Sequence, residues 1–220
     1  MAQRKTAFVT GEFYHVYNRG VDKRIIFPSE KDIQRFFLSM LEFNTINSIG
    51  SIYEHSFDKS TDTKRSKKLV NFIAYCLNPN HYHFLLEQAA ERGVEKFMQR
   101  LGTGYTNFFN NKHRRSGVLF QGKFKAVHVD KNEYLLHLSA YVNLNNRVHS
   151  LGSLASKLVK TSWEEYGSVN KRKRGEFCKK GIILDQFKNK KEYKKFAESS
   201  LKDILERRSK LEDLDKLLLE

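Results

Sequence analysis

Hydrophobic and polar residues follow two different periods along the first two thirds of the chain. Strand-like runs, rich in aromatic and β-branched residues, occur at Phe13–Tyr17, Gly50–Phe57, Leu69–Leu77, Tyr82–Leu86 and Phe124–Val129. Apolar residues with helical spacing occur at Lys31–Asn44, with Ser29 as its cap, and at Gly93–Asn111 and Glu133–Asn145. The order predicts an α+β fold of the ferredoxin-like or RRM-like type, in which helices pack on one antiparallel sheet.

Two segments between these elements have turn or loop character. Asn78-Pro79-Asn80 separates two strand-like runs and predicts an antiparallel hairpin, because proline stops regular strand pairing. Asp58–Lys68 is charged and lacks apolar periodicity, which predicts an exposed loop.

The composition changes beyond Trp163. Lys171–Arg174 is a basic run, and Lys188–Glu220 is charged with sparse apolar positions at helical spacing. We therefore expect one domain over residues 1–168 and a basic, mostly helical C-terminal extension over 169–220. The charge of the extension suits either binding to a polyanion or a solvated helical surface.

The overall charge points to a polyanionic partner. The chain has 40 Lys and Arg against 25 Asp and Glu, a formal charge of +15, so nucleic acid is the expected partner and charge for solubility alone is the alternative. We expect no membrane span or signal peptide and a cytoplasmic location. Cys76 and Cys178 lie far apart, which predicts neither a disulfide framework nor a zinc finger.

A His-x-His pattern opens the second strand of the predicted hairpin. Side chains alternate along a strand, so His81 and His83 share one face and Tyr82 lies on the other. Two neutral imidazoles on one face suit a metal ion. The pattern alone also fits two histidines that only form hydrogen bonds at a sheet surface.

Tyr141 and Asn145 stand four residues apart in the third predicted helix, which places a phenol beside an amide on one helical face. An amide oxygen can act as a hard metal ligand, and a phenol near a metal can act as a nucleophile. Tyr105 and Tyr134 are rival nucleophiles. Phe109 and Leu138 follow them at the same spacing, so neither rival has a polar ligand on its face.

Basic residues and phenylalanines interleave between Asn107 and Lys125. This mixture suits single-stranded DNA, with cations on phosphates and rings available for stacking, although the phenylalanines equally fit the core. The expected DNA-contacting residues are Arg114, Arg115, Lys123 and Lys125, together with Arg19 in the segment Asn18-Arg19-Gly20. A turn role for that last segment is the alternative.

Four motifs together resemble the single-tyrosine HUH transposases (the IS200-like transposases), and among them the REP-associated tyrosine transposases. They are GEFYHVYNRG at Gly11–Gly20, LNPNHYHFLL at Leu77–Leu86, GYTNFFNNKHRRSGVLFQGKFKA at Gly104–Ala126, and HLSAYVNLNNRV at His137–Val148. The resemblance covers Gly11–Tyr166. Two departures occur: Asn145-Asn146 replaces Asn-Pro, and Tyr82 replaces a bulky apolar residue.

The resemblance implies an enzyme that nicks and joins single-stranded DNA near a hairpin during transposition. It implies a divalent metal, Mg²⁺ or Mn²⁺, held by His81, His83 and Asn145, and a 5′-phosphotyrosine link formed by Tyr141. No ATP is implied, and relatives act as monomers or homodimers.

Two other classes of protein remain possible at this point. A non-catalytic nucleic-acid-binding module on the same fold explains the charge but not the four site residues. An HUH relaxase or replication initiator shares the chemistry, but such proteins are usually larger.

Overall fold

The computed structural model describes residues 6–53, 67–148, 158–167 and 177–217. Its sheet has five strands in the order β4-β1-β3-β2-β5: β1 (Phe13–Arg19), β2 (Val70–Asn78), β3 (His81–Gln88), β4 (Lys125–Val129) and β5 (Lys160–Thr161). Every neighbouring pair is antiparallel. The predicted α+β fold is confirmed.

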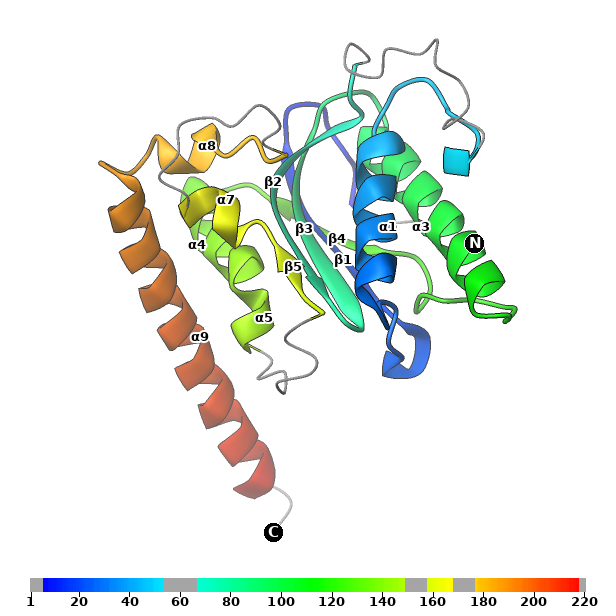
Figure 1. Cartoon of the computed structure of the whole chain (residues 1–220). Helices are drawn as coiled ribbons and strands as arrows, with labels where there is room; N and C mark the ends of the chain where they lie inside the picture. Colours follow the sequence, from blue (N-terminus) through cyan, green and yellow to red (C-terminus); the bar gives the residue numbers. More distant parts are fainter. Residues whose placement is uncertain (1–5, 54–66, 149–157, 168–176, 218–220) are drawn as a thin grey trace.

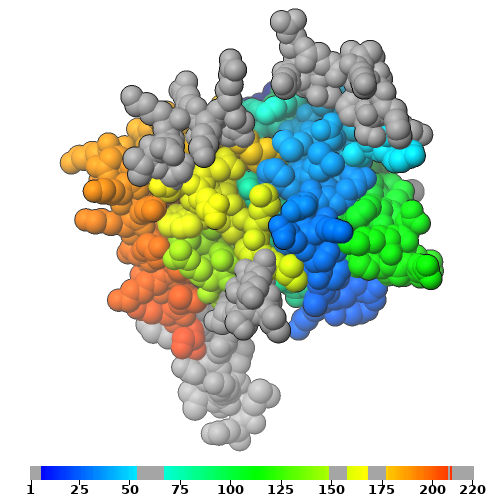
Figure 2. Space-filling model, in the orientation of Figure 1, coloured from blue at the N-terminus to red at the C-terminus, as the bar shows by residue number. Residues whose placement is uncertain are grey.

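Helices cover both faces of the sheet (Figure 1). One face carries α1 (Glu30–Glu42) and α3 (Gly93–Lys112). The other face carries α4 (Asn132–Asn143), α5 (Asn145–Val148), α7 (Trp163–Gly167), α8 (Gly181–Leu184) and α9 (Lys190–Leu217). A short 3₁₀ turn, η1 (Val21–Lys23), follows β1. The space-filling view shows the surfaces of α1 and α3, in blue and green, on one side and those of α7 and α9, in yellow and orange, on the other (Figure 2). We call the two sides the α1/α3 face and the α4 face.

Strand alternation divides the residues of β3 between the two faces. Tyr82, Phe84 and Leu86 are buried in the core beneath α1 and α3, whereas Leu85 is buried in the core beneath α4. His81 and His83 occupy positions of the same parity as Leu85, so they lie on the α4 face as predicted. The two-residue turn between β2 and β3 fixes where this alternation begins.

The strand expected at Gly50–Phe57 is wrong within the described residues. Ile52 and Tyr53 are helical, and residues 54–57 lie outside the described part of the chain. Among the described residues 50–53 the large apolar side chains are Ile52 and Tyr53, and Tyr53 is 74% exposed, so these residues bury little surface. The outer side of β2 instead pairs with β5, through Cys76 and Thr161 and through Leu77 and Lys160.

The third helix is shorter than expected. α4 ends at Asn143, and Leu144 leaves helical geometry with φ −109° and ψ 11°. Asn145 then begins α5, so Tyr141 and Asn145 do not share one continuous helix. Both side chains nevertheless approach the histidines of β3: Tyr141 contacts His83, and Asn145 contacts His81.

Two close contacts join α1 to α3. A Cβ atom added at Gly104 would lie 2.5 Å from the Phe43 ring, so the absence of a side chain lets the helices approach. The Asp32 carboxylate is buried and accepts hydrogen bonds from Lys112 Nζ at 2.8 Å and from Ser29 Oγ, with His113 Nε2 at 3.3 Å. These contacts hold the two helices in register.

The C-terminal extension is helical where it is described. α9 packs against α4, and Tyr193, Ala197 and Leu201 are buried in the core beneath α4. The expected boundary at residue 168 and the basic run Lys171–Arg174 lie outside the described residues, as do residues 58–66 of the expected loop. No helix in the described ranges is long and apolar enough to span a membrane.

Candidate functional site

The hydrogen bonds of His81 define the state of its ring. Nδ1 lies 2.6 Å from Asn80 Oδ1, which only accepts, so the ring proton belongs on Nδ1. The Nε2 atom then lies 2.8 Å from Asn78 Nδ2, from which it can accept, and 3.1 Å from Asn145 Oδ1. The ring of His81 is therefore held at both nitrogens, with Nε2 beside the Asn145 amide.

Asn145 is buried beside His81, and its amide is satisfied on one side only within the described residues. Its side chain is fully buried, and its Oδ1 accepts from Asn78 Nδ2 at 2.8 Å. Its Nδ2 is buried and has no hydrogen-bond partner among the described residues. Structural amides are normally satisfied on both sides, so the orientation favours presenting the oxygen toward His81.

Asn78 lies between two acceptors. Its Nδ2 group donates to both His81 Nε2 and Asn145 Oδ1, each at 2.8 Å. An imidazole nitrogen and an amide oxygen turned toward one positive group also suit a divalent cation. The described residues contain no metal-holding cluster of three or more His, Cys, Asp or Glu side chains, so an ion here would depend on the amide and on outside ligands.

Tyr141 lies beside the other histidine. Its half-buried ring is edge-on to His83, with centroids 5.6 Å apart and planes at 85°. The rival Tyr105 is fully buried and donates to Ile26 O at 2.6 Å, and burial raises the pKa of its phenol far above the usual range. Tyr134 is 40% exposed, and burial followed by the nearby Tyr17 raises the pKa of its phenol. Of the three, Tyr141 is the one whose ring contacts the histidine pair.

A third histidine belongs to the site and was missed in the sequence. His15 of β1 is buried, its Nε2 is 2.9 Å from His83 Nδ1, and the rings stack with centroids 5.1 Å apart. Burial lowers the pKa of His15 to about 4, so the ring is neutral near pH 7. Its ring also meets Tyr141 edge-on at 6.1 Å. Strand alternation could have found it in the sequence, because His15 lies two residues before Tyr17 and therefore on the same face of the strand.

The expected DNA-contacting residues fall into two groups. Arg19 pairs with His81 in the strand register and Lys125 pairs with Tyr17, so both exposed residues lie on the α4 face. Arg114 and Lys123 are exposed on the loop between α3 and β4. That loop borders the end of β1 that pairs with His81, because Gln121 N donates to Arg19 O at 2.8 Å.

Arg115 has a structural role within that loop. Its guanidinium donates to Asn110 Oδ1 at 2.8 Å and Val118 O at 2.9 Å, and it lies over the Phe109 ring. The phenylalanines of the segment pack in or against the core beneath α1 and α3: Phe108, Phe109, Phe120 and Phe124. The structure therefore favours the core alternative for these rings over base stacking.

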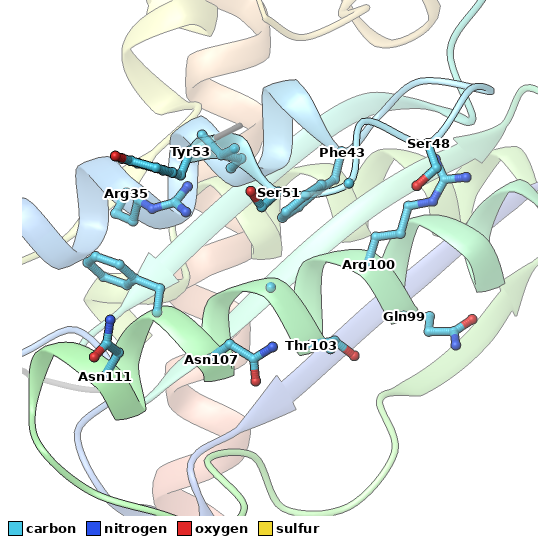
Figure 3. A pocket seen from close by; sticks show the side chains of 14 residues that line it. Arg35, Phe43, Ser48, Ser51, Tyr53, Gln99, Arg100, Thr103, Asn107 and Asn111 are labelled. Carbon is cyan, nitrogen blue, oxygen red and sulfur yellow. The ribbon is translucent and has the colours of Figure 1, made fainter. Parts of the chain in front are cut away.

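A cleft of about 980 Å³ lies on the α1/α3 face, away from the histidines (Figure 3). Its two arginines are already engaged. Arg100 donates to Thr45 O at 2.6 Å, and Arg35 donates to Ser39 Oγ at 3.3 Å and lies over the Phe108 ring. The cleft therefore presents few free charges to a ligand.

Comparison with known proteins agrees with the arrangement on the α4 face. The family model "Transposase IS200 like" matches residues 48–145, a range that includes both histidines of β3, Tyr141 and Asn145. The predicted resemblance to the IS200-like transposases is confirmed. A search of curated proteins found no match.

A solved structure shares the fold of this chain. It is described as the REP-associated tyrosine transposase bound to a REP hairpin, with a TM-score of 0.51, 13% identity, and coverage of 80% of this chain and 98% of the other. At that identity the match establishes the fold, including the sheet that carries the candidate site.

Proposed function

We propose that this protein nicks and rejoins single-stranded DNA, with Tyr141 as the nucleophile. The observation that carries the proposal is the position of the Tyr141 ring. Its centroid lies 5.6 Å from the centroid of the His83 ring and 6.1 Å from that of the His15 ring. The family match supports a transposase, and the geometry supports the role of this tyrosine. All these residues belong to one chain, so a monomer would suffice for the chemistry.

The proposed step exchanges one phosphate ester for another. The Tyr141 oxygen attacks the phosphorus, the bond from phosphorus to the 3′ oxygen breaks, and a 5′-phosphotyrosine forms. The phenolic proton passes to solvent, and the leaving oxygen takes up a proton to become a 3′-hydroxyl. Because the ester is retained, a 3′-hydroxyl can attack it and reseal the strand without ATP.

The donor set of the site fits a divalent metal, Mg²⁺ or Mn²⁺, held by His81, His83 and Asn145. When bound, such an ion neutralises charge that develops on the phosphate oxygens. His15 is a positioning residue in this scheme. If His83 Nδ1 donates to His15 Nε2, the proton is fixed on Nδ1 and the Nε2 lone pair stays available as a ligand.

The proposed substrate is a single strand beside a hairpin; the solved structure with the same fold is described as bound to a REP hairpin. Arg19 and Lys125 are placed to contact phosphates near the histidines, and Arg114 and Lys123 to contact the strand or stem farther along. We retain residues 1–168 as the transposase domain and 169–220 as its extension, which braces α4 through α9.

A covalent-adduct assay tests the proposal. Labelled single-stranded DNA that contains a hairpin is incubated with Mg²⁺ or Mn²⁺, and adducts are resolved on a denaturing gel. Wild type should give an adduct that Tyr141→Phe abolishes. An adduct that persists in Tyr141→Phe and disappears in Tyr134→Phe would contradict the assignment. DNA binding without an adduct in any condition would favour a non-catalytic binding module.

The positioning role of His15 has its own readout. His15→Leu should raise the metal concentration for half-maximal adduct formation by about 10- to 100-fold, the usual effect of losing a hydrogen bond to a metal ligand. His15→Gln keeps a polar group near His83 and should restore part of this loss. If both variants show the wild-type metal requirement, His15 serves packing alone.

A further inference from the structure

The α4 face of the sheet is covered unevenly. α4 packs chiefly on β2 and β3, where the core residues are buried. On β1 and β4, by contrast, Tyr17 is half-buried and Val127 is 42% exposed. An open strip of sheet therefore begins beside His83 and runs to the β4 edge.

Two tyrosines border this strip. Tyr17 stacks on His83 with centroids 5.5 Å apart and planes at 16°. Tyr134 lies two helical turns before Tyr141, so the two side chains fall on one stripe of α4. Tyr134 is 40% exposed, and burial followed by the nearby Tyr17 raises the pKa of the Tyr134 phenol. Aromatic surface thus continues outward from the proposed nucleophile.

The charge of the strip suits a polyanion. The β1 and β4 residues on this face are Phe13, His15, Tyr17, Arg19, Lys125, Val127 and Val129. They include two cations and no carboxylate. Lys125 is the neighbour of Tyr17 across the strands, and Arg19 is the neighbour of His81. Cations beside exposed rings are the arrangement with which proteins hold unpaired nucleotides.

We propose that Tyr17, Val127 and Tyr134, flanked by Arg19 and Lys125, form a stacking platform for the unpaired bases next to the scissile phosphate. The inference rests on the proposed function and deepens it, because it assigns the surface that holds the single strand. The rings stack on bases, and the two cations track the phosphates. The strand then passes Tyr141 on its way to the histidines.

Binding of hairpin DNA with and without a single-stranded tail tests the platform. The measurements use fluorescence anisotropy in a Tyr141→Phe background, which prevents covalent capture, and probes with the tail on either the 5′ or the 3′ side. Tyr134→Ala should weaken the tail-dependent part of the affinity by about 5- to 150-fold, while Tyr134→Phe keeps the ring and the affinity. Tyr134 is the diagnostic residue because Tyr17→Ala would also disturb His83.

Tyr53→Ala is the matched control, since this tyrosine is 74% exposed and lines the cleft on the α1/α3 face. It should leave the tail-dependent affinity unchanged. Equal affinities for Tyr134→Ala and Tyr134→Phe would overturn the platform, and so would a loss that is the same for hairpins without a tail. Sedimentation that shows a dimer dissociated by Tyr134→Ala would overturn it too, because a second copy would then occupy the strip.

The two proposals fail in different ways. If the platform is wrong, protein with Tyr141 intact still forms the adduct and Tyr134→Ala binds the tail normally. If the nicking proposal is wrong, no adduct forms, yet Tyr134→Ala still loses tail-dependent binding.

Discussion

Tyr193→Phe tests whether α9 holds the helix that carries Tyr141. The Tyr193 hydroxyl is buried between Asn143 Nδ2 at 2.9 Å and Ser139 Oγ at 3.1 Å. Those two residues of α4 stand two positions after and before Tyr141, so they lie on the opposite side of the helix. Burial raises the pKa of Tyr193 to about 12, so the group is a neutral phenol at any working pH.

The magnitude follows from the hydrogen bonds that the variant loses. Ser139 Oγ already donates to Leu136 O at 2.7 Å, so Tyr193 donates to Ser139 and accepts from Asn143. Phenylalanine fills the same space but leaves the buried Asn143 N–H without an acceptor. One unsatisfied buried group costs about 1–3 kcal/mol. With an m value of about 2 kcal/mol/M, the urea midpoint should fall by about 0.5–1.5 M.

Urea unfolding followed by circular dichroism measures this loss, and the adduct assay run in the same buffer reports on the placement of Tyr141. Tyr134→Phe is the control for stability. Tyr134 is 40% exposed, so loss of its hydroxyl should change the free energy of unfolding by less than about 0.5 kcal/mol. A Tyr193→Phe protein as stable as this control would refute the reasoning. The hydroxyl would then be dispensable for holding α4.

Two further predictions concern the contacts between α1 and α3. Gly102→Ala should stabilise the protein by up to about 1 kcal/mol, because nothing lies within 4 Å of the added Cβ atom. Gly104→Ala should destabilise it by about 1–3 kcal/mol, because the added Cβ atom meets the Phe43 ring. Equal midpoints of thermal unfolding for the two variants would contradict this prediction. Burial alone would raise the pKa of Asp32, but hydrogen bonds from Lys112 and the two other donors lower it on balance. A lowered pKa gives stability that is present above the unfolded value of about 3.9 and is lost as the pH falls through the folded value. Asp32→Asn should therefore cost about 3 kcal/mol at pH 7 and progressively less as the pH falls below about 3.9. Urea unfolding over this pH range would show a constant difference if the reasoning fails.

Local chemistry made several features of the fold predictable. The β2–β3 hairpin followed from Asn78-Pro79-Asn80, because proline and asparagine favour turns wherever they occur. The separation of His81 and His83 from Tyr82 followed from strand alternation, which is a property of the backbone. The short strand β5 was not predicted, since two residues carry too little pattern to recognise.

Two features follow from short stretches of sequence: His81 and His83 share one strand face because strand side chains alternate, and Tyr141 lies on a helix because the apolar residues around it recur at helical spacing. The partners that meet these residues come from distant parts of the chain, so packing selects them. His15 reaches His83 across 68 positions through the register of β1 and β3, and Asn145 contacts His81 from a separate short helix that begins after the break at Leu144. Packing likewise decided which aromatic rings are free. The phenylalanines beside the basic residues became core, since that sheet face is covered by α1 and α3, and the tyrosines of the half-covered α4 face stayed open to a ligand.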